Sequence, residues 1–342
     1  MSEHVYEMAV VGAGPIGLEL AAALKRAGVD YVHFDAQQIG HTMTWWAPNT
    51  RFFSSNERIA IAGVPLLTPD QTKATREQYL TYLRTVVETF DLQINTFEPV
   101  KAVTKDGDAF TLATLPRGGE RTWRAKRVVL ATGGTDRPRL IGVPGEGLPH
   151  VSHYFADPHT YFRQNVTVVG GKNSAVEAAL RCHHAGARVT IVHREPTIPD
   201  AEIKYWLVPE FRGLIASGRI ASHFDARVTE ITNTHVLLSA AGKQSAVEAD
   251  FVLLMTGYVQ DNALLAAADV PMDGPCSRPV YDPKTMQTRT AGLYVAGTAV
   301  GGTQDKYRVF IENCHDHVDK IVQHAFGERA KVNRVTVDLP ES

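Results

Sequence analysis

The 342-residue chain has few cysteines, no excess of charge of one sign and no long apolar run. Its three cysteines, Cys182, Cys276 and Cys314, are too few and too far apart for a disulfide framework, and no CxxC pair occurs. The formal net charge of −2 provides no basic field for nucleic acid or an anionic membrane. No segment approaches the about 20 consecutive apolar residues of a membrane-spanning helix. The N-terminal segment lacks a signal-peptide pattern, so the expected location is the cytoplasm.

The sequence divides into two halves with a similar order of predicted strands and helices. Hydrophobic residues make up 44% and charged residues 21% of the sequence, enough for sizeable cores, and the length favours two domains. Each half predicts a strand, a helix and a strand, at residues 5–11, 14–27 and 31–34 and again at residues 166–169, 174–185 and 189–192. Such β-α-β units imply parallel strands.

Other segments complete this pattern. They are a helix over 76–90, an antiparallel meander within 92–123, strands over 127–131, 251–255 and 292–296, and a helix of about 15–20 residues from near Val309. We therefore expect an α/β fold of two Rossmann-like dinucleotide-binding domains, the second inserted in the first. The inserted domain is predicted at 139–256, and the first domain at 1–138 and 257–342.

The first glycine loop spans residues 12–17 (GAGPIG), between a predicted strand and a predicted helix. Gly12 permits the tight turn, Gly14 the approach of a diphosphate, and Gly17 the packing of helix on strand. The helix N-terminus then faces the diphosphate with free N–H groups. Asp35, at the end of the next strand, can accept hydrogen bonds from ribose hydroxyls. This half therefore predicts a dinucleotide site.

The second glycine loop spans residues 170–175 (GGKNSA) and departs from the pattern, because Lys172 replaces the second glycine. A lysine at this position can instead reach a phosphate. His193 and Arg194, rather than an acid, follow the next strand. A carboxylate would repel a 2′-phosphate, whereas a guanidinium binds it through two hydrogen bonds. The loop therefore favours NADPH over NADH, with a solvated Arg194 as the alternative.

Both loops, the Thr-Gly turns at 132–133 and 256–257, and GLYVAG at 292–297 resemble the thioredoxin-reductase-like flavoproteins over nearly the whole chain. Four segments are similar to one branch, the bacillithiol-disulfide reductase family. They are FFSSNE at 52–57, GGKNSAVEAA at 170–179, IKYWLVPEF at 203–211 and FIEN at 310–313. Lys172 is what this branch would lead one to expect.

The resemblance implies that FAD binds the first domain with the tail, that NADPH binds the inserted domain, and that the protein is a homo-oligomer. The predicted cofactor contacts of the first domain and tail are Gly12, Gly14, Pro15, Gly17, Asp35, Ala36, Trp45, Phe53, Ser54, Thr132, Gly133, Gly257, Gly297 and Thr298. Those of the inserted domain are Gly170, Gly171, Lys172, Asn173, Ser174, His193 and Arg194. The aromatic residues at 45, 46, 52 and 53 form either a wall beside the flavin or ordinary core.

Two positions depart from the relatives. Ile16 stands in the first glycine loop where the branch often has a cysteine. Thr298 follows Gly297 where thioredoxin reductases have an acid that contacts the ribityl chain of the flavin. A threonine hydroxyl can still donate a hydrogen bond, so we expect FAD binding to persist in a weaker form.

The route of the electrons to the acceptor also differs from thioredoxin reductases. They carry a CxxC just before the second glycine loop, and the matching segment at 151–158 (VSHYFADP) has no cysteine. The flavin must then deliver electrons without a protein disulfide. Weak catalytic candidates are Cys314, for which the start of a helix predicts a lowered thiol pKa, and His153 and Tyr154 as proton donors. The run CHDH at 314–317 is interpreted as polar helix surface and not as a metal site, because neighbours at i and i+2 point to different faces.

The leading hypothesis is an NADPH-dependent FAD oxidoreductase that acts on a small disulfide such as bacillithiol disulfide. One alternative is a flavin monooxygenase, whose linker HVSHY at 150–154 is similar. A second is a ferredoxin–NADP reductase of the thioredoxin-reductase type. A third is a redox-sensing flavoprotein of slow turnover, for which Ile16 and Thr298 leave room. The expected partner is a small-molecule acceptor, with neither nucleic acid nor membrane.

Overall fold

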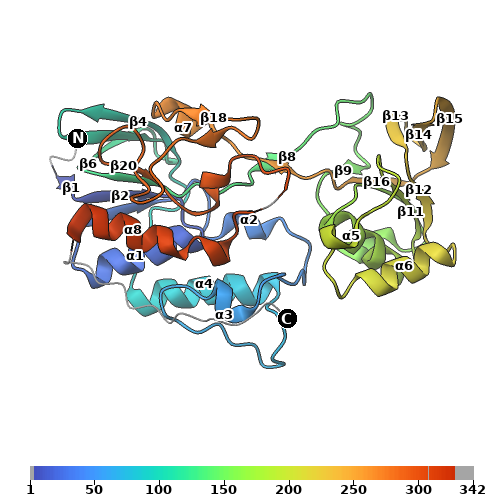
Figure 1. The fold of residues 1–342 in the computed structure, drawn as a ribbon, viewed down its shortest axis with the longest axis horizontal. Helices are drawn as coiled ribbons and strands as arrows, with labels where there is room; N and C mark the ends of the chain where they lie inside the picture. The colour runs from blue at the N-terminus through green and yellow to red at the C-terminus, as the bar shows by residue number, and fades with distance from the viewer. Residues whose placement is uncertain (1–3, 307, 328–342) are drawn as a thin grey trace. The chain divides into compact units, whose positions relative to one another are not determined.

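The computed structural model describes residues 4–306 and 308–327, which form two compact units (Figure 1). The first unit takes in the chain up to Thr44, Asn49–Arg137 and the chain from Val259 onward, and the second takes in Trp45–Pro48 and Pro138–Tyr258. The second unit thus consists of two separate segments of the chain. The shorter one, Trp45–Pro48, lies within the range 1–138 that the sequence predicts as part of the first domain. The part of the predicted range 257–342 beyond Gly327 lies outside the described residues.

The first unit is built on a four-stranded parallel sheet in the order β20-β7-β2-β3. Its strands are β2 (Met8–Val11), β3 (Tyr31–Phe34), β7 (Val128–Leu130) and β20 (Leu293–Val295). They are short, almost fully buried apolar runs, as expected for parallel strands. Two helices, α1 (Pro15–Arg26) and α8 (His315–Phe326), pack against each other beside this sheet (Figure 1).

A second, smaller sheet of this unit corrects the prediction of one strand over 5–11. That segment is divided at Glu7, whose backbone N–H donates to Asp30 O at 2.9 Å. The residues before it form β1 (Val5–Tyr6), which pairs with β6 instead of continuing into β2. The sheet order is β1-β6-β5-β4, with β4 (Val100–Asp106), β5 (Ala109–Thr114) and β6 (Arg121–Ala125) as the predicted antiparallel meander.

Helix α4 (Arg76–Phe90) has the predicted bounds because its first turn is capped reciprocally. The backbone N–H of Gln78 donates to Thr75 Oγ1 at 3.3 Å, and the Thr75 N–H donates to Gln78 Oε1 at 2.8 Å. The remaining elements of the first unit are short. They are α2 (His41–Thr44), α3 (Asn56–Ile59), α7 (Ala263–Ala267), β18 (Met272–Asp273), β19 (Arg278–Pro279), and the 3-10 helices η3 (Gly297–Gly301) and η4 (Ile311–Asn313).

The second unit repeats the β-α-β arrangement around a five-stranded parallel sheet in the order β12-β11-β10-β16-β9. Its strands are β9 (Val151–Ser152), β10 (Asn165–Val169), β11 (Arg188–Val192), β12 (Ala221–His223) and β16 (Phe251–Leu254). The helical elements are α5 (Asn173–His184), α6 (Val208–Ala216), η1 (Pro158–Tyr161) and η2 (Asp200–Glu202). An antiparallel sheet adds β13 (Arg227–Ile231), β14 (His235–Ala240) and β15 (Lys243–Glu248). The predicted α/β fold of two Rossmann-like units, one inserted in the other, is confirmed. At the limits of the insertion lie β8 (Arg137–Pro138) and β17 (Tyr258–Val259).

The helix predicted from near Val309 is wrong at its start, because α8 begins only at His315. Side chains satisfy the backbone before that point. Gln304 Oε1 accepts from the Val309 N–H at 2.9 Å, and Asn313 Oδ1 accepts from the Phe310 N–H at 2.8 Å. These N–H groups are therefore bonded locally instead of to helical carbonyls. As a result, Cys314 lies at the N-cap of α8 and not within its first turn.

Candidate functional site

The first glycine loop is closely packed on its inner side and open at its centre. Gly12 has φ +107°, and a Cβ atom there would lie 2.3 Å from Ala131 O. A Cβ atom at Gly17 would lie 1.9 Å from Gly12 O. At Gly14, by contrast, no described atom lies within 4 Å of a Cβ position beyond its own neighbours. The loop therefore leaves space at Gly14, the glycine at which the dinucleotide motif predicts the approach of a diphosphate. Pro15 begins the helix after it.

Two side chains at the end of β3 support this loop. Asp35 Oδ2 accepts from the Ala13 N–H at 2.6 Å, and its Oδ1 accepts from the Gln37 N–H at 2.8 Å. Burial raises the pKa of Asp35, and these two N–H groups oppose the rise. His33, which is fully buried, has Nε2 2.9 Å from Gly12 O, and burial lowers its pKa to about 4. His33 is part of no recognised motif, so the motifs do not identify it, although its position between apolar residues of a parallel strand marks it as buried. Ala36, a predicted contact, is exposed.

The turns that follow β7 and β20 lie together because these strands are neighbours. Thr298 Oγ1 accepts from the Gly134 N–H at 2.9 Å, so the hydroxyl hydrogen of Thr298 remains available to a ligand. Gly133 has φ +84° and open space at its Cβ position. The N–H of Gly297 donates to His317 Nδ1 at 3.1 Å. The predicted residues Thr132, Gly133, Gly297 and Thr298 therefore share one edge of the sheet with the glycine loop.

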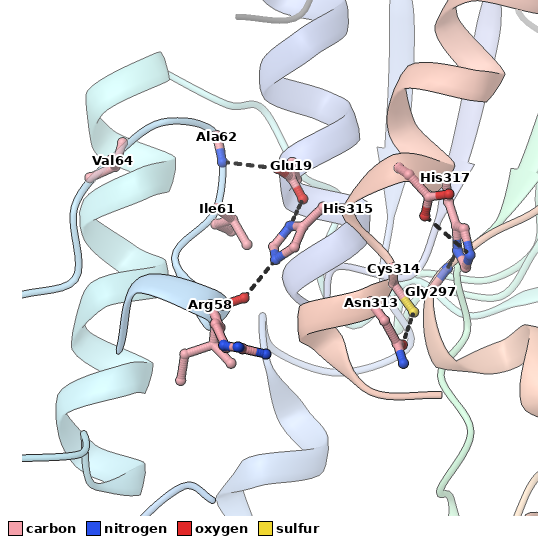
Figure 2. A network of polar contacts seen from close by, with 12 residues as sticks. Glu19, Arg58, Ile61, Ala62, Val64, Gly297, Asn313, Cys314, His315 and His317 are labelled. Carbon is pink, nitrogen blue, oxygen red and sulfur yellow. Dashed lines mark hydrogen bonds and ion pairs between the residues drawn. The ribbon is translucent and has the colours of Figure 1, made fainter. Parts of the chain in front are cut away.

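A buried ion pair connects α1 to the start of α8 (Figure 2). Glu19 Oε2 lies 2.7 Å from His315 Nδ1, and Glu19 Oε1 accepts from the Ala62 N–H at 3.3 Å. His315 Nε2 lies 2.8 Å from Arg58 O, which can only accept, so this nitrogen carries a hydrogen. A further proton lies between Nδ1 and the carboxylate. The pair holds the helix of the first glycine loop, α8 and the segment after α3 together.

The aromatic residues of the FFSSNE region have different environments. Phe52 belongs to the core and packs on Tyr79 with ring centroids 4.6 Å apart. Phe53 is 46% exposed beneath the Lys73 ammonium, and Ser54 is buried. Trp45 belongs to the second unit, where its ring lies 5.4 Å from that of Tyr154 and 4.6 Å from that of Tyr258. Of the predicted first-domain contacts, Trp45 and Gly257 thus belong to the second unit and the others to the first.

The second glycine loop is covered by a side chain. Gly170 has φ +152° and packs on Met255 O, which would lie 2.5 Å from a Cβ atom. A Cβ atom at Gly171 would lie 2.1 Å from Cε1 of His193. The imidazole of His193 therefore lies over Gly171, and burial lowers its pKa. A side chain at position 171 would therefore require the His193 ring to move.

The polar groups around this loop have partners within the second unit. Lys172 Nζ pairs with Glu202 Oε2 at 2.9 Å, and Asn173 Oδ1 accepts from the Lys204 N–H. Arg194 is 68% exposed and its Nε lies 3.4 Å from Glu195 Oε1. Ser174, at the start of α5, is exposed. At the end of the unit, Gly257 has φ +93° and open space at its Cβ position.

The three weak catalytic candidates differ in what the structure allows. Cys314 is fully buried, and burial raises the pKa of its thiol to about 12, opposite to the lowering expected from a helix start. His153 Nε2 lies 3.4 Å from Glu146 Oε1, and burial lowers the pKa of this histidine. Tyr154 packs in the aromatic cluster with Trp45 and Tyr258. Among the described residues, no group of three or more histidine, cysteine or acidic side chains is arranged to hold a metal ion.

Comparison of the sequence with known proteins identifies the family of this chain. A model of the pyridine nucleotide-disulphide oxidoreductases matches residues 9–297. The chain belongs to this family. Bacilliredoxin reductase Bdr of Bacillus subtilis is 36% identical over 310 residues, which cover 90% of this chain and 94% of the relative. The chain is therefore a flavin-dependent oxidoreductase of the disulfide reductase class, with a pyridine nucleotide as the second cofactor.

Two solved structures are similar over almost their whole length. Bacillithiol disulfide reductase Bdr (YpdA) from Bacillus cereus has a TM-score of 0.89 at 37% identity, covering 94% of this chain and 99% of its own. The protein of the same name from Staphylococcus aureus has a TM-score of 0.88 at 32% identity, covering 95% and 99%. The resemblance inferred from the sequence segments is thus confirmed. Within the described part of this family member, no helix is both long and apolar enough to cross a membrane.

Proposed function

We propose that this chain is an NADPH-dependent FAD oxidoreductase that reduces a small disulfide, bacillithiol disulfide or a close analogue of it. The observation that carries the proposal is the likeness, over nearly the whole chain, to two solved proteins that bear the name bacillithiol disulfide reductase. The absence of a CxxC pair from the sequence supports a small acceptor that needs no protein dithiol. The first unit is then the FAD domain and the second the NADPH domain.

The residues of the first unit fit FAD. The open position at Gly14 accommodates a diphosphate, whose charge the N-terminus of α1 would stabilise. Asp35 would hold a ribose hydroxyl with the carboxylate lone pairs that its two backbone bonds leave unused. Thr298 would donate its hydroxyl hydrogen, because its oxygen already accepts from Gly134. Gly12, Pro15, Gly17, Ala36, Phe53, Ser54, Thr132, Gly133 and Gly297 complete the proposed contacts in the first unit, and Trp45 and Gly257, which belong to the second unit, stay predicted contacts of this cofactor.

The second unit offers two cations to a 2′-phosphate. The side chain of Lys172 is 48% exposed and pairs with Glu202, and that of Arg194 is 68% exposed beside Glu195. A phosphate carries more charge than one carboxylate and accepts the planar guanidinium in a bidentate manner. Replacement Arg194→Ala is expected to raise the KM for NADPH by roughly tenfold, with little effect on the KM for NADH, since each charge-assisted hydrogen bond contributes about 1.5–3 kcal/mol. Gly170, Gly171, Asn173, Ser174 and His193 would complete this site.

Two of the chain's three cysteines, Cys182 and Cys314, are poor candidates for a relay of electrons because they are buried. Bound FAD would supply the chemistry that transfers two electrons, so that NADPH, a proton and one disulfide yield NADP⁺ and two thiols. With a pKa of about 12, Cys314 stays a thiol at neutral pH, and burial raises the pKa of Cys182 to about 12 as well. His153, whose Nε2 lies 3.4 Å from Glu146 Oε1, and Tyr154 stay the proposed proton donors.

The test is anaerobic mixing of the yellow protein with NADPH or NADH, followed by mixing with a chosen acceptor. We expect NADPH to bleach the flavin absorbance faster than NADH does, and bacillithiol disulfide to restore it with two thiols formed per NADPH oxidised. Reduced ferredoxin as the product would instead identify a ferredoxin–NADP reductase. A hydroxylated product formed with oxygen would identify a monooxygenase, and reoxidation by none of these acceptors would favour a sensor. The cytoplasmic location and the homo-oligomer stay predictions.

A further inference from the structure

His317 connects helix α8 to the turn that contains the proposed flavin contacts Gly297 and Thr298. Its Nδ1 accepts the backbone N–H of Gly297 at 3.1 Å (Figure 2). The residue is 7% exposed, so this hydrogen bond is shielded from water. Because Nδ1 accepts, the imidazole is neutral and its hydrogen lies on Nε2, 3.8 Å from Asp316 Oδ1. The contact with Gly297 therefore requires one particular tautomer of the histidine.

The turn needs support from outside, because glycine can adopt many backbone conformations. Gly297 has φ +68°, in the left-handed region, and a Cβ atom there would lie 3.3 Å from Ile16 Cβ. The first glycine loop therefore packs closely on this residue, and His317 supplies its polar contact. The next residue, Thr298, accepts from the Gly134 N–H at 2.9 Å. Three segments distant in sequence thus hold two consecutive residues of the turn.

The start of α8 is a firm support for this contact. The Glu19–His315 pair, 2.7 Å apart, joins it to α1, and the two helices pack against each other. His317 follows two residues later, and neighbours at i and i+2 point to different faces of a helix. Val318 and Ile321 of the same helix are fully buried in the core of the first unit. The backbone that carries the His317 imidazole is therefore held in place independently of Gly297.

We propose that His317 is a positioning residue for the flavin. By holding the Gly297 N–H, it fixes the direction in which Thr298 presents its hydroxyl to the cofactor. A protein group that is already oriented loses less conformational entropy when the ligand binds. Removal of the hydrogen bond should therefore weaken FAD binding by about fivefold, which corresponds to about 1 kcal/mol. This proposal rests on the proposed function, because it requires FAD in the first unit.

Three replacements of His317 separate the effect of the hydrogen bond from that of side-chain volume. The side-chain oxygen of asparagine is attached to Cγ, as Nδ1 of histidine is, so His317→Asn keeps an acceptor for Gly297. His317→Gln moves the acceptor one bond further out, and His317→Leu removes it while it fills the space with apolar atoms. If packing alone mattered, His317→Asn would bind FAD most weakly of the three, because it leaves the largest cavity. If positioning matters, it binds FAD most tightly of the three.

The assay is a titration of the flavin-free protein with FAD, monitored by flavin fluorescence. Circular dichroism of each flavin-free variant during heating checks that it is folded. We expect His317→Asn to bind FAD within twofold of the unchanged chain, and His317→Gln and His317→Leu to bind it about fivefold more weakly. The matched control is His324, on the same helix, whose Nδ1 lies 3.0 Å from the Tyr294 hydroxyl in β20, before the turn. His324→Leu should change the affinity for FAD by less than twofold.

Several outcomes would overturn the proposal. One is a His317→Leu variant that binds FAD within twofold of the unchanged chain, and another is a His317→Asn variant that binds it more weakly than His317→Leu. A third is an equal loss in His324→Leu, since the effect would then come from α8 as a whole. If His317→Leu does not fold, equal affinities of His317→Asn and His317→Gln overturn the proposal. An unchanged chain that binds no FAD would instead overturn the proposed function, and the role of His317 with it.

Discussion

Replacing either partner of the Glu19–His315 pair is expected to destabilise the first unit by about 3 kcal/mol. The two side chains are 6% and 17% exposed and lie 2.7 Å apart, so the loss of one leaves the other buried without its partner. Breaking such a buried pair costs about 3–5 kcal/mol. The lower end applies because Glu19 keeps the Ala62 N–H and His315 keeps Arg58 O (Figure 2). For a domain of 150–250 residues, this corresponds to a fall of roughly 6–12 °C in melting temperature.

The assay is thermal unfolding, monitored both by the increase in flavin fluorescence as the cofactor is released and by circular dichroism. Glu19→Leu and His315→Leu are compared with the double variant, which removes both charges together. We expect the melting temperature of the double variant to fall by much less than the sum of the falls in the two single variants. The reason is that an apolar pair can replace a buried ion pair at small cost in stability. An exposed pair between α1 and the C-terminal end of α4 provides the control. Lys25 and Asp91, 3.3 Å apart, are 44% and 78% exposed, so Lys25→Ala should cost about 0.5 kcal/mol or less.

Two results would refute this reasoning. One is a melting temperature for Glu19→Leu that falls no further than that of Lys25→Ala. The other is a double variant whose loss equals the sum of the two single losses, since that would mean that the charges do not interact across the 2.7 Å contact.

Further predictions concern the cofactor site and the buried titratable groups. Gly14→Ala should leave the flavin-free protein stable yet weaken FAD binding roughly tenfold or more in a fluorescence titration, because its Cβ position is open only to the ligand. Gly17→Ala should lower the melting temperature itself, since its Cβ atom would lie 1.9 Å from a carbonyl oxygen. Cys314→Ala should retain disulfide reduction, and the native Cys314 thiol should resist alkylation at pH 8, because its pKa is about 12. His33 stays neutral in the folded protein down to a pH of about 4, whereas in the unfolded chain it takes up a proton below about 6.5. Stability that this residue contributes above pH 6.5 is therefore lost as the pH falls towards 4, by about 2 kcal/mol between pH 7 and pH 5. The replacement His33→Gln should reduce the fall in melting temperature over that interval, and an unchanged fall would exclude His33 as its cause.

The repeated β-α-β units could be predicted from the sequence because the signals that specify them are local. A run of apolar residues that ends in glycine, followed by a helical period, specifies a strand, a turn and a helix without distant information. The same reasoning failed for the start of α8, where the side chains of Gln304 and Asn313 take the backbone N–H groups that a helix would use. It also failed for the Cys314 thiol, because burial among residues distant in sequence outweighs the effect of the helix start.

Contacts between distant segments were not accessible from the sequence either. The ring of His193 over Gly171 depends on the register of β10 and β11, which brings the ends of the two strands together. Sequence motifs therefore identified the dinucleotide loops, while the protein groups that support or complete them required the fold.

The segment Trp45–Pro48 belongs to the second unit, and this affects any attempt to produce the two units as separate proteins. Ala47 is buried in the core of that unit, and Arg181 donates to Pro48 O at 2.6 Å. A gene fragment that encodes only residues 138–258 would lack this peptide, and would expose the apolar surface that Ala47 covers. A usable nucleotide-binding fragment should therefore carry the tetrapeptide as a grafted extension, or receive it as a separate synthetic peptide. The same docking makes the segment a suitable place for a reporter, because the fluorescence of Trp45 will follow the state of the second unit although its sequence neighbours belong to the first.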